Sequence, residues 1–159
     1  FKYLEFMKNI LLITLILLCA AAYSQSKYKN LFEQNGKIGI GTKKPDALLT
    51  VKGNIHTQEV LVDLKGAVAP DYVFQNYFNG ESKLNPNYTF QTLKQVEDFV
   101  AKNHHLPGIP SAETLDKDGL SLKKMNLILL EKIEELTLYL IEQQKEIETL
   151  KEIVYTLKE

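Results

Sequence analysis

The glycines between Asn35 and Ile55 are the first candidates for a functional site, because a glycine-rich loop can bind phosphate. A dinucleotide-binding fingerprint needs a strand, the pattern G-x-G-x-x-G and then a helix. Here Gly39-Ile40-Gly41 is followed by Thr42-Lys43-Lys44-Pro45, so the third glycine is missing, and P-loop spacing is absent too. We expect these glycines to allow tight turns and close approach of a neighbouring backbone, and we expect no cofactor.

The other residues able to do chemistry are isolated. His56, His104 and His105 lack the second cluster that a metal site would need, and His104-His105 suit a helix C-terminus. Ser121-Leu122-Lys123-Lys124 spells S-x-x-K, but Ser121 is also an obvious helix cap, and Ser111 has no G-x-S-x-G context. The acidic pairs Glu134-Glu135 and Glu146, Glu148 are expected on a solvated helix face. We therefore expect no catalytic or metal-binding residues and no enzyme activity.

Composition limits the possible partners. The chain has 159 residues, enough for one domain with appendages, and a formal net charge of −1. All its basic residues other than histidine are Lys, so it lacks the Arg fork that reads guanine or clamps phosphate. Both observations argue against nucleic acid as a partner.

The N-terminal residues predict export. Met7-Lys8-Asn9 is followed by an apolar run from Ile10 to Ala22, which is too short to span a bilayer comfortably. Ala22 and Ser24 are placed like an A-x-A cleavage site, so we expect a signal peptide at 7–24, cut after Ser24, with Phe1–Phe6 upstream of the true start. The predicted location is secreted or at the cell surface.

A lipoprotein signal is the alternative reading of the same run. Cys19 would be the lipidated residue, but Leu18 before it is larger than such signals prefer. We favour Cys19 as a small apolar residue of the signal peptide. The mature chain then has no cysteine and no disulfide.

Short strands are predicted in the next part of the chain. Residues 25–36 are polar enough for a flexible lead-in, and a β-repeat is expected over 37–66. Within it Ile38 and Ile40 share one face, Leu49 and Val51 alternate with polar residues, and a third alternating run covers 60–64. These strands are too few to enclose a core, and other copies of the chain are a natural source of partners.

A small junction module is expected over 67–120. Thr92 and Gln95 form a capping-box pattern, so a helix should begin there and stop near Asn103 before two prolines. A further helical turn is expected at Ser111–Leu115. The module also contains an aromatic segment that either fills a core or stacks on sugars, and we favour core. Its residues are Tyr72, Phe74, Tyr77, Phe78, Tyr88 and Phe90.

Residues 121–159 predict a long helix with a coiled-coil seam. No Gly or Pro interrupts the segment after Ser121. Heptad positions a and d, the two that face a partner helix, hold Leu122, Asn126, Leu129, Ile133, Leu136, Leu140, Gln143, Ile147, Leu150, Val154 and Leu157. One chain cannot cover such a stripe, so self-association is expected through Leu129, Ile133, Leu136, Leu140, Gln143, Ile147, Leu150, Val154 and Leu157.

Apolar residues also lie off the seam in the first half of this helix. They include Leu127, Ile128, Leu130, Leu138, Tyr139 and Ile141. We expect the junction module to fold back onto them. Packing rules for a and d lean towards a dimer, while the buried Gln143 and the wide apolar face are compatible with a trimer.

Four strings resemble those of secreted, tail-fibre-like proteins of Bacteroidetes: "GKIGIGTKKPDALLTVKGNI", "DYVF", "HHLPGIPSAETL" and "EKIEELTLYLIEQQKEIETLK". The similarity covers roughly Asn35 to Lys151. It implies a trimeric, fibre-like surface protein of which this segment is the C-terminal end. A more distant similarity to endosialidase-chaperone tail domains implies possible self-cleavage at a serine, for which this chain has no matching motif.

The combined expectation is an α+β chain with a short β-repeat stalk, a small α/β junction module and a long, trimeric C-terminal coiled coil. The expected function is structural assembly of an exported protein, with self-association as a homotrimer favoured over a dimer. The alternatives are a surface adhesin or glycan-binding module, and a self-cleaving chaperone tail. No nucleic-acid partner is expected.

Overall fold

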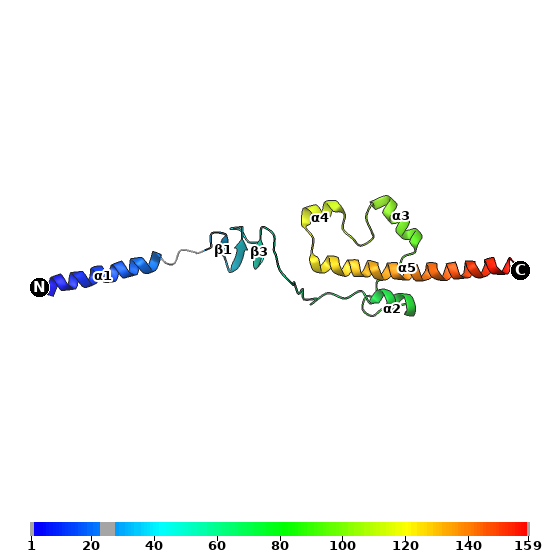
Figure 1. The fold of residues 1–159 in the computed structure, drawn as a ribbon, viewed down its shortest axis with the longest axis horizontal. Helices are drawn as coiled ribbons and strands as arrows, with labels where there is room; N and C mark the ends of the chain where they lie inside the picture. The colour runs from blue at the N-terminus through cyan, green and yellow to red at the C-terminus, as the bar shows by residue number, and fades with distance from the viewer. Residues whose placement is uncertain (1, 23–27, 159) are drawn as a thin grey trace. The chain divides into compact units, whose positions relative to one another are not determined.

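The computed structural model describes residues 2–22 and 28–158, and the side chains of 2–16 and 28–158. It divides the chain into two compact units, Phe1–Val60 and Leu61–Glu159. The described residues form five helices and one three-stranded sheet (Figure 1), which confirms the predicted mixed α+β class.

The first unit begins with α1 (Lys2–Ala22), whose described side chains are all exposed. No helix within residues 2–22 and 28–158 combines the length and apolar character needed to cross a membrane. The expected cleavage point after Ser24 and the side chain of Cys19 lie outside the described residues. The signal peptide therefore stays a prediction.

The sheet of the first unit begins with a hairpin. Strands β1 (Leu31–Gln34) and β2 (Lys37–Ile40) pair antiparallel across a turn in which Asn35 has φ 52° and Gly36 has φ 74°. Asn-Gly suits such a two-residue turn because both positions need positive φ. The prediction that 25–36 is a flexible lead-in is wrong for residues 31–34, because the Asn35-Gly36 turn pairs them with β2.

Strand β3 (Leu49–Val51) pairs with β2 in parallel, after a connection shorter than parallel strands usually need. The Oγ1 atom of Thr50 forms three hydrogen bonds that fix the end of the connection between β2 and β3. It donates to Asp46 Oδ1 at 2.7 Å and accepts the backbone N–H groups of Asp46 and Ala47, both at 3.1 Å. The hydrogen bond from Thr50 holds the pKa of Asp46 below its usual value.

The glycines of this unit have the structural use that their spacing predicted. A Cβ on Gly39 would lie 2.2 Å from Thr42 O, and one on Gly41, where φ is 74°, would lie 2.8 Å from Lys52 O. Gly39 and Gly41 therefore permit close backbone approach, and a strand follows them where a phosphate-binding motif needs a helix.

The sheet register places the apolar side chains on one face. Leu31 opposes Ile40, Ile38 opposes Leu49, and Ile40 opposes Val51. Leu31, Ile38, Ile40 and Leu49 are all more than 40% exposed, so this face is bare in the single chain. The third strand expected over 60–64 is not formed, and these residues have no strand partner.

The second unit contains α2 (Tyr72–Asn79), α3 (Leu93–Asn103), α4 (Ala112–Asp118) and α5 (Leu122–Thr156). The capping box of Thr92 and Gln95 is confirmed, with each side chain bound to the other residue's backbone N–H. Ser111 and Ser121 cap α4 and α5 by accepting the N–H groups of Thr114 and Lys124. These caps explain why the predicted helix starts agree with the structure.

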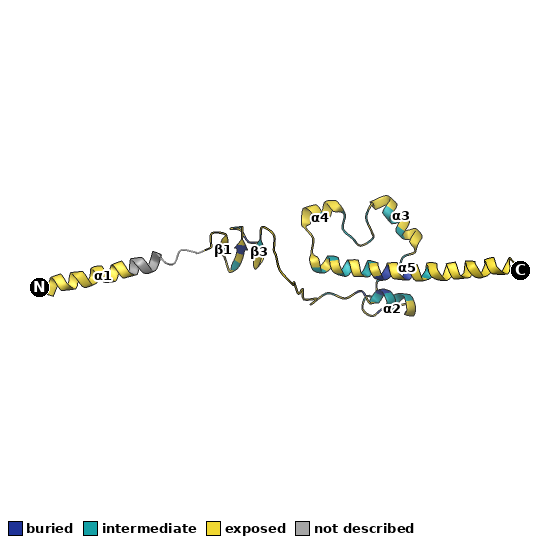
Figure 2. Ribbon diagram, in the orientation of Figure 1, coloured by how far each residue is buried: buried dark blue, intermediate teal, exposed yellow. Residues whose placement is uncertain are grey.

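The junction module folds onto α5, as predicted. Figure 1 shows α2 on one side of α5 and α3 and α4 on the other, and α2 contacts α5 directly. Val73 of α2 and Leu138 of α5 are fully buried, and Tyr139 is 6% exposed. Figure 2 shows the buried part of α5 confined to the region beside α2, with the C-terminal end exposed.

Most rings of the aromatic segment are half-buried and pack against one another or against Tyr139 of α5, which agrees better with the core interpretation than with an open surface. Tyr72 stacks at 5.0 Å on Tyr88, and Phe90 lies 5.6 Å from Tyr77 and 4.9 Å from Tyr139, measured between ring centroids. Phe78 is the exception, with 66% of its surface exposed.

Candidate functional site

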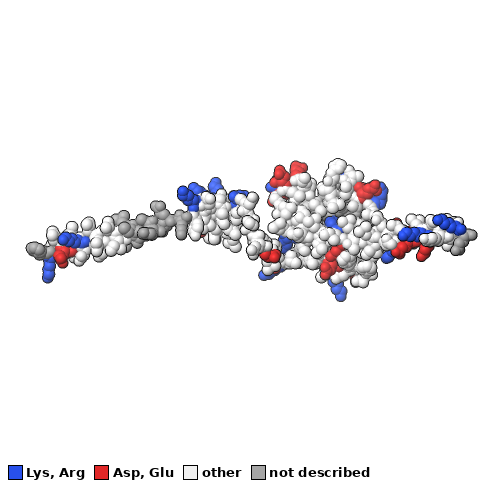
Figure 3. Space-filling model, in the orientation of Figure 1, with Lys and Arg blue, Asp and Glu red and all other residues white. Residues whose placement is uncertain are grey.

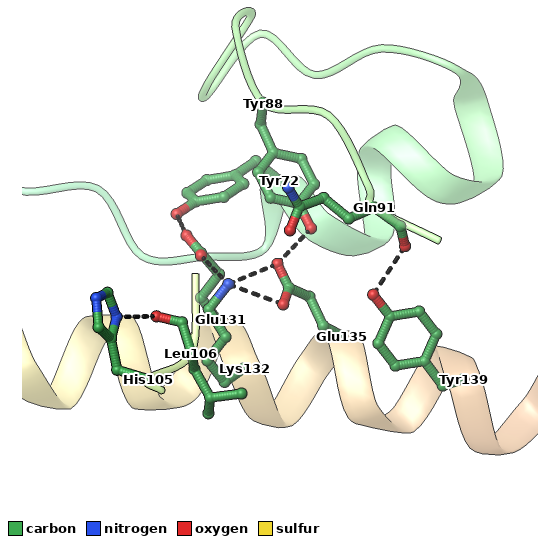
Figure 4. A network of polar contacts seen from close by, with 9 residues as sticks. All are labelled: Tyr72, Tyr88, Gln91, His105, Leu106, Glu131, Lys132, Glu135 and Tyr139. Carbon is green, nitrogen blue, oxygen red and sulfur yellow. Dashed lines mark hydrogen bonds and ion pairs between the residues drawn. The ribbon is translucent and has the colours of Figure 1, made fainter. Parts of the chain in front are cut away.

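Lys132 forms the centre of the largest polar network in the described second unit (Figure 4). Its Nζ atom lies 2.9 Å from Glu131 Oε1, 2.8 Å from Glu135 Oε2 and 3.0 Å from Glu135 Oε1. The three side chains are only 10–18% exposed. Burial alone would lower the pKa of Lys132, but Glu135 and Glu131 outweigh it and raise that pKa.

Two tyrosines of the module connect it to this network, and Tyr139 of α5 makes a separate hydrogen bond to the module. Tyr72 OH donates to Glu131 Oε2, Tyr88 OH to Glu135 Oε1 at 2.9 Å, and Tyr139 OH to the carbonyl of Gln91 at 2.8 Å. Burial, followed by the adjacent carboxylates, raises the pKa of Tyr72 and Tyr88, and raises that of Tyr139 to about 12. All three hydroxyls stay protonated at neutral pH and remain donors.

The interactions that this arrangement offers are hydrogen bonds and ion pairs that hold the junction module on α5. Lys132 is held as an ammonium, which has no lone pair for nucleophilic attack, and its carboxylate neighbours are already engaged by ammonium and phenol donors. The network instead joins α2 and the segment 88–91 to α5 by directional bonds. Because the cost of desolvating buried charges offsets much of their attraction, such a network is weak evidence for net stability, and its clear structural role is to fix where the module docks.

Glu134 is the one buried charge that this network does not satisfy. It is 6% exposed, and among the described residues its Oε2 atom has no hydrogen-bond partner. Burial, with the charges of Asp71 and Glu131, raises its pKa. The prediction that Glu134-Glu135 lies on a solvated face is therefore wrong, because the module covers that face and uses Glu135 as a hydrogen-bond acceptor.

The residues predicted to mediate self-association lie on a different face of α5. Positions a and d of the seam are exposed in the single chain, and Figure 2 shows this exposure along the C-terminal end. We call this face the ridge; it comprises Leu129, Ile133, Leu136, Leu140, Gln143, Ile147, Leu150, Val154 and Leu157. Its apolar members are between 43% and 81% exposed.

The buried residues of α5 occupy the other heptad positions. Leu138 is at f, Glu134 at b, Glu135 at c and Tyr139 at g, so the module covers the side away from the ridge and, at Tyr139, one flank of it. The structure thus buries the predicted off-seam residues Leu138 and Tyr139 and leaves the ridge exposed, with Leu136 at the edge of the module. Figure 3 shows Lys and acidic side chains interspersed around the C-terminal end of α5, as on a water-facing helix surface.

The remaining candidates have local structural uses. His104 ends α3 with φ 59°, as a helix C-cap, and His105 Nδ1 lies 3.1 Å from the carbonyl of Leu106. His56 is exposed in the first unit, and in the described part of the chain no group of three or more His, Cys, Asp or Glu side chains could hold a metal ion. Ser111 and Ser121 serve as helix caps.

Sequence reasoning missed the network of Glu131, Lys132 and Glu135. A usable signal was their position: charges at f, g and c alternate in sign and lie beside apolar Leu138 and Tyr139. Several tyrosines upstream offered the matching hydroxyl donors.

No family model, curated protein or solved structure matches this chain. Function is therefore inferred from the residues and contacts of the chain itself.

Proposed function

We propose that this chain is an exported structural protein that assembles with copies of itself through the ridge of α5. The observation that carries the proposal is the exposure of an apolar heptad seam on a helix of 35 residues. Burying one Leu or Ile side chain stabilises by about 1.5–3 kcal/mol, so a bare ridge of this length strongly favours association. Copies of the same helix fit the ridge because heptad spacing is complementary to itself.

The sheet of the first unit supports the same proposal. Leu31, Ile38, Ile40 and Leu49 present a second bare apolar face on a sheet of only three strands. A sheet with one apolar face must bury that face against another element. Copies brought together by α5 would supply it, which agrees with a short stalk built from the β-repeat. We favour a homotrimer, on the resemblance to tail-fibre-like proteins, with a dimer as the alternative.

The test is the mass of the purified protein by light scattering across a range of concentrations. We expect a defined oligomer and a melting temperature that rises with protein concentration. Ile147→Asp should shift the protein to monomer, because it places a charge in the seam. Thr149→Asp is the matched control, since Thr149 is exposed at position c. A monomeric mass at every concentration would refute the proposal.

Binding to surface glycans is a second candidate function, favoured by the exposed ring of Phe78. This ring lies 4.9 Å from that of Tyr77 in an edge-on arrangement, and together they could stack on a sugar. A glycan array with the wild type and Phe78→Ala tests it. Binding that is lost in Phe78→Ala while the oligomeric mass is kept would support it, and the same array result for both proteins would refute it.

A further inference from the structure

The two flanks of the ridge differ in the single chain. Positions g on one flank are covered by the junction module: Lys132 and Tyr139 line a hollow of about 60 Å³ with Val96, Leu106 and Pro107. Met125, the preceding g residue, lines a groove with residues of α4 and the segment before it. On the other flank, Lys123 at the start of α5 is half-buried and donates to the Lys65 carbonyl of its own chain, whereas the next e residues, Leu130, Thr137 and Gln144, are all exposed.

The module continues the apolar ridge on the covered flank. Leu106 is 42% exposed, and it shares its hollow with Leu136, a ridge residue that is 56% exposed. A partner helix seated on the ridge would therefore meet Leu106 as well as the seam of α5.

The charges along the open flank change where the module ends. Beside the module-covered stretch the e positions after Lys123 are Leu130, Thr137 and Gln144, all uncharged. Beyond it they are Lys151 and Lys158, the usual type of residue at a water-exposed e position. In a parallel coiled coil each g residue faces the e residue five positions later on the next helix, so Met125, Lys132 and Tyr139 face these three uncharged residues.

We propose that the junction module of one copy packs against the open e flank of the next copy, with Leu106 against Thr137 and the segment around Pro110 and Leu115 against Leu130. This inference rests on the proposed self-association and specifies its parallel geometry. Each copy then covers its neighbour's open flank in one rotational direction. The ridge and the module form one continuous interface, and the polar network of Lys132 holds the module in the position that this interface requires.

Disulfide trapping tests the proposed contact. Leu106→Cys and Thr137→Cys are combined in the full chain with Cys19→Ser, which removes the one native cysteine. Mild oxidation should link different chains, giving covalent multimers up to the full oligomer on non-reducing gels. Mixing the two single-cysteine proteins should give a covalent heterodimer, which separates a link between chains from one within a chain.

The control pair is Leu106→Cys with Lys145→Cys, because Lys145 is exposed at position f, away from the seam. It should give few covalent multimers. Absence of an inter-chain link in a protein that keeps its oligomeric mass would overturn this inference and leave the proposed function intact. A monomeric mass would overturn both.

A charge on the open flank gives an independent readout. Leu130→Lys should weaken assembly by about tenfold in the concentration for half-association, because a partly exposed leucine would otherwise be buried by the neighbour. Leu61→Lys is the matched control, since Leu61 is 95% exposed. The same concentration for half-association in the two variants would contradict the contact at Leu130. Circular dichroism of both variants shows whether each keeps its helical fold.

Discussion

Two faces of α5 show opposite relations between polarity and burial. The face covered by the junction module carries Glu131, Lys132, Glu134 and Glu135 around Leu138, and all of these are largely buried. The ridge carries Leu and Ile at almost every position, and it is exposed. An amphipathic helix in a self-sufficient domain has the reverse arrangement, with its apolar stripe inside.

This difference indicates that the two faces have different kinds of partner. On the polar face, Glu131 and Glu135 each accept a hydrogen bond from a tyrosine hydroxyl of the same chain, which suits a fixed, directional docking. The ridge is matched by heptad spacing alone, which suits other copies of the helix. Under the proposed function, the single chain buries the polar face of α5 by itself and needs other copies to bury the ridge. Substitutions on the polar face should therefore lower the stability of each chain, and substitutions on the ridge should weaken association.

The largest expected effect is at Lys132. Lys132→Met removes the ammonium and leaves the carboxylates of Glu131 and Glu135 buried without it. We expect about 3–5 kcal/mol of lost unfolding free energy, the usual cost of breaking a buried pair on one side. Urea unfolding at a fixed protein concentration measures it. The exposed Lys145→Met should change little, and a comparable loss there would remove the distinction between the faces.

A pair of leucines two residues apart tests the comparison directly. Leu138→Ala should cost about 2–5 kcal/mol at every protein concentration, because Leu138 is fully buried within its own chain. Leu140→Ala should lower the melting temperature mainly by weakening assembly, because Leu140 is 65% exposed in the single chain. Thermal melts over a hundredfold concentration range separate the two. A concentration-independent loss of equal size at Leu140 would contradict a role for the ridge in association.

Local signals in the sequence were sufficient for several elements of this fold. The capping box of Thr92 and Gln95, the serine caps of α4 and α5, and the absence of Gly and Pro after Ser121 each act within a few residues of the helix that they predict. The packing of the module on α5 was also predictable, because the apolar residues of α5 outside the heptad seam need to be covered.

Features that depend on a partner were harder to predict. Residues 60–64 alternate like a strand but find no strand to pair with, and alternation cannot show whether a partner exists. Helix α2 (Tyr72–Asn79) lacks a clear sequence signal because it is short and rich in aromatics, and its N-cap residue Asp71 makes no side-chain cap. Glu134 and Glu135 were expected in water because charge is normally exposed, and only the tertiary fold buries both and places Tyr88 on Glu135.

A smaller effect is expected from the hydroxyl of Tyr139. Tyr139→Phe keeps the ring on Phe90 but removes the hydrogen bond to the Gln91 carbonyl. We expect a loss of about 1–3 kcal/mol, since the carbonyl would lose its partner at a partly buried site. Tyr155→Phe, at a residue that is 71% exposed, is the control for loss of a hydroxyl. An unchanged midpoint for Tyr139→Phe would show that this bond does not help to hold the module.

The smallest expected effect has the opposite sign. Glu134→Gln should stabilise the protein at pH 7 by about 1 kcal/mol, because it removes a buried charge whose Oε2 atom lacks a hydrogen-bond partner among the described residues. Folding raises the pKa of Glu134 above its ordinary value of 4.5, so its charged form costs stability above the folded pKa. Falling pH protonates Glu134 and relieves that cost, so the advantage of Glu134→Gln should shrink as the pH falls through the folded pKa towards 4.5.

The neighbouring residue provides the matched comparison for this substitution. Glu135 is buried to a similar extent but accepts from Lys132 and Tyr88, so Glu135→Gln should destabilise where Glu134→Gln stabilises. Urea unfolding of both variants at pH 7 and at pH 4.5 gives the two signs and the trend. If both variants were destabilised at pH 7, the carboxylate of Glu134 would be hydrogen-bonded in the folded protein, contrary to the unpartnered Oε2 atom in the structure. If both were stabilised, the contacts of Glu135 would not repay its burial, and shape alone would hold the module on α5.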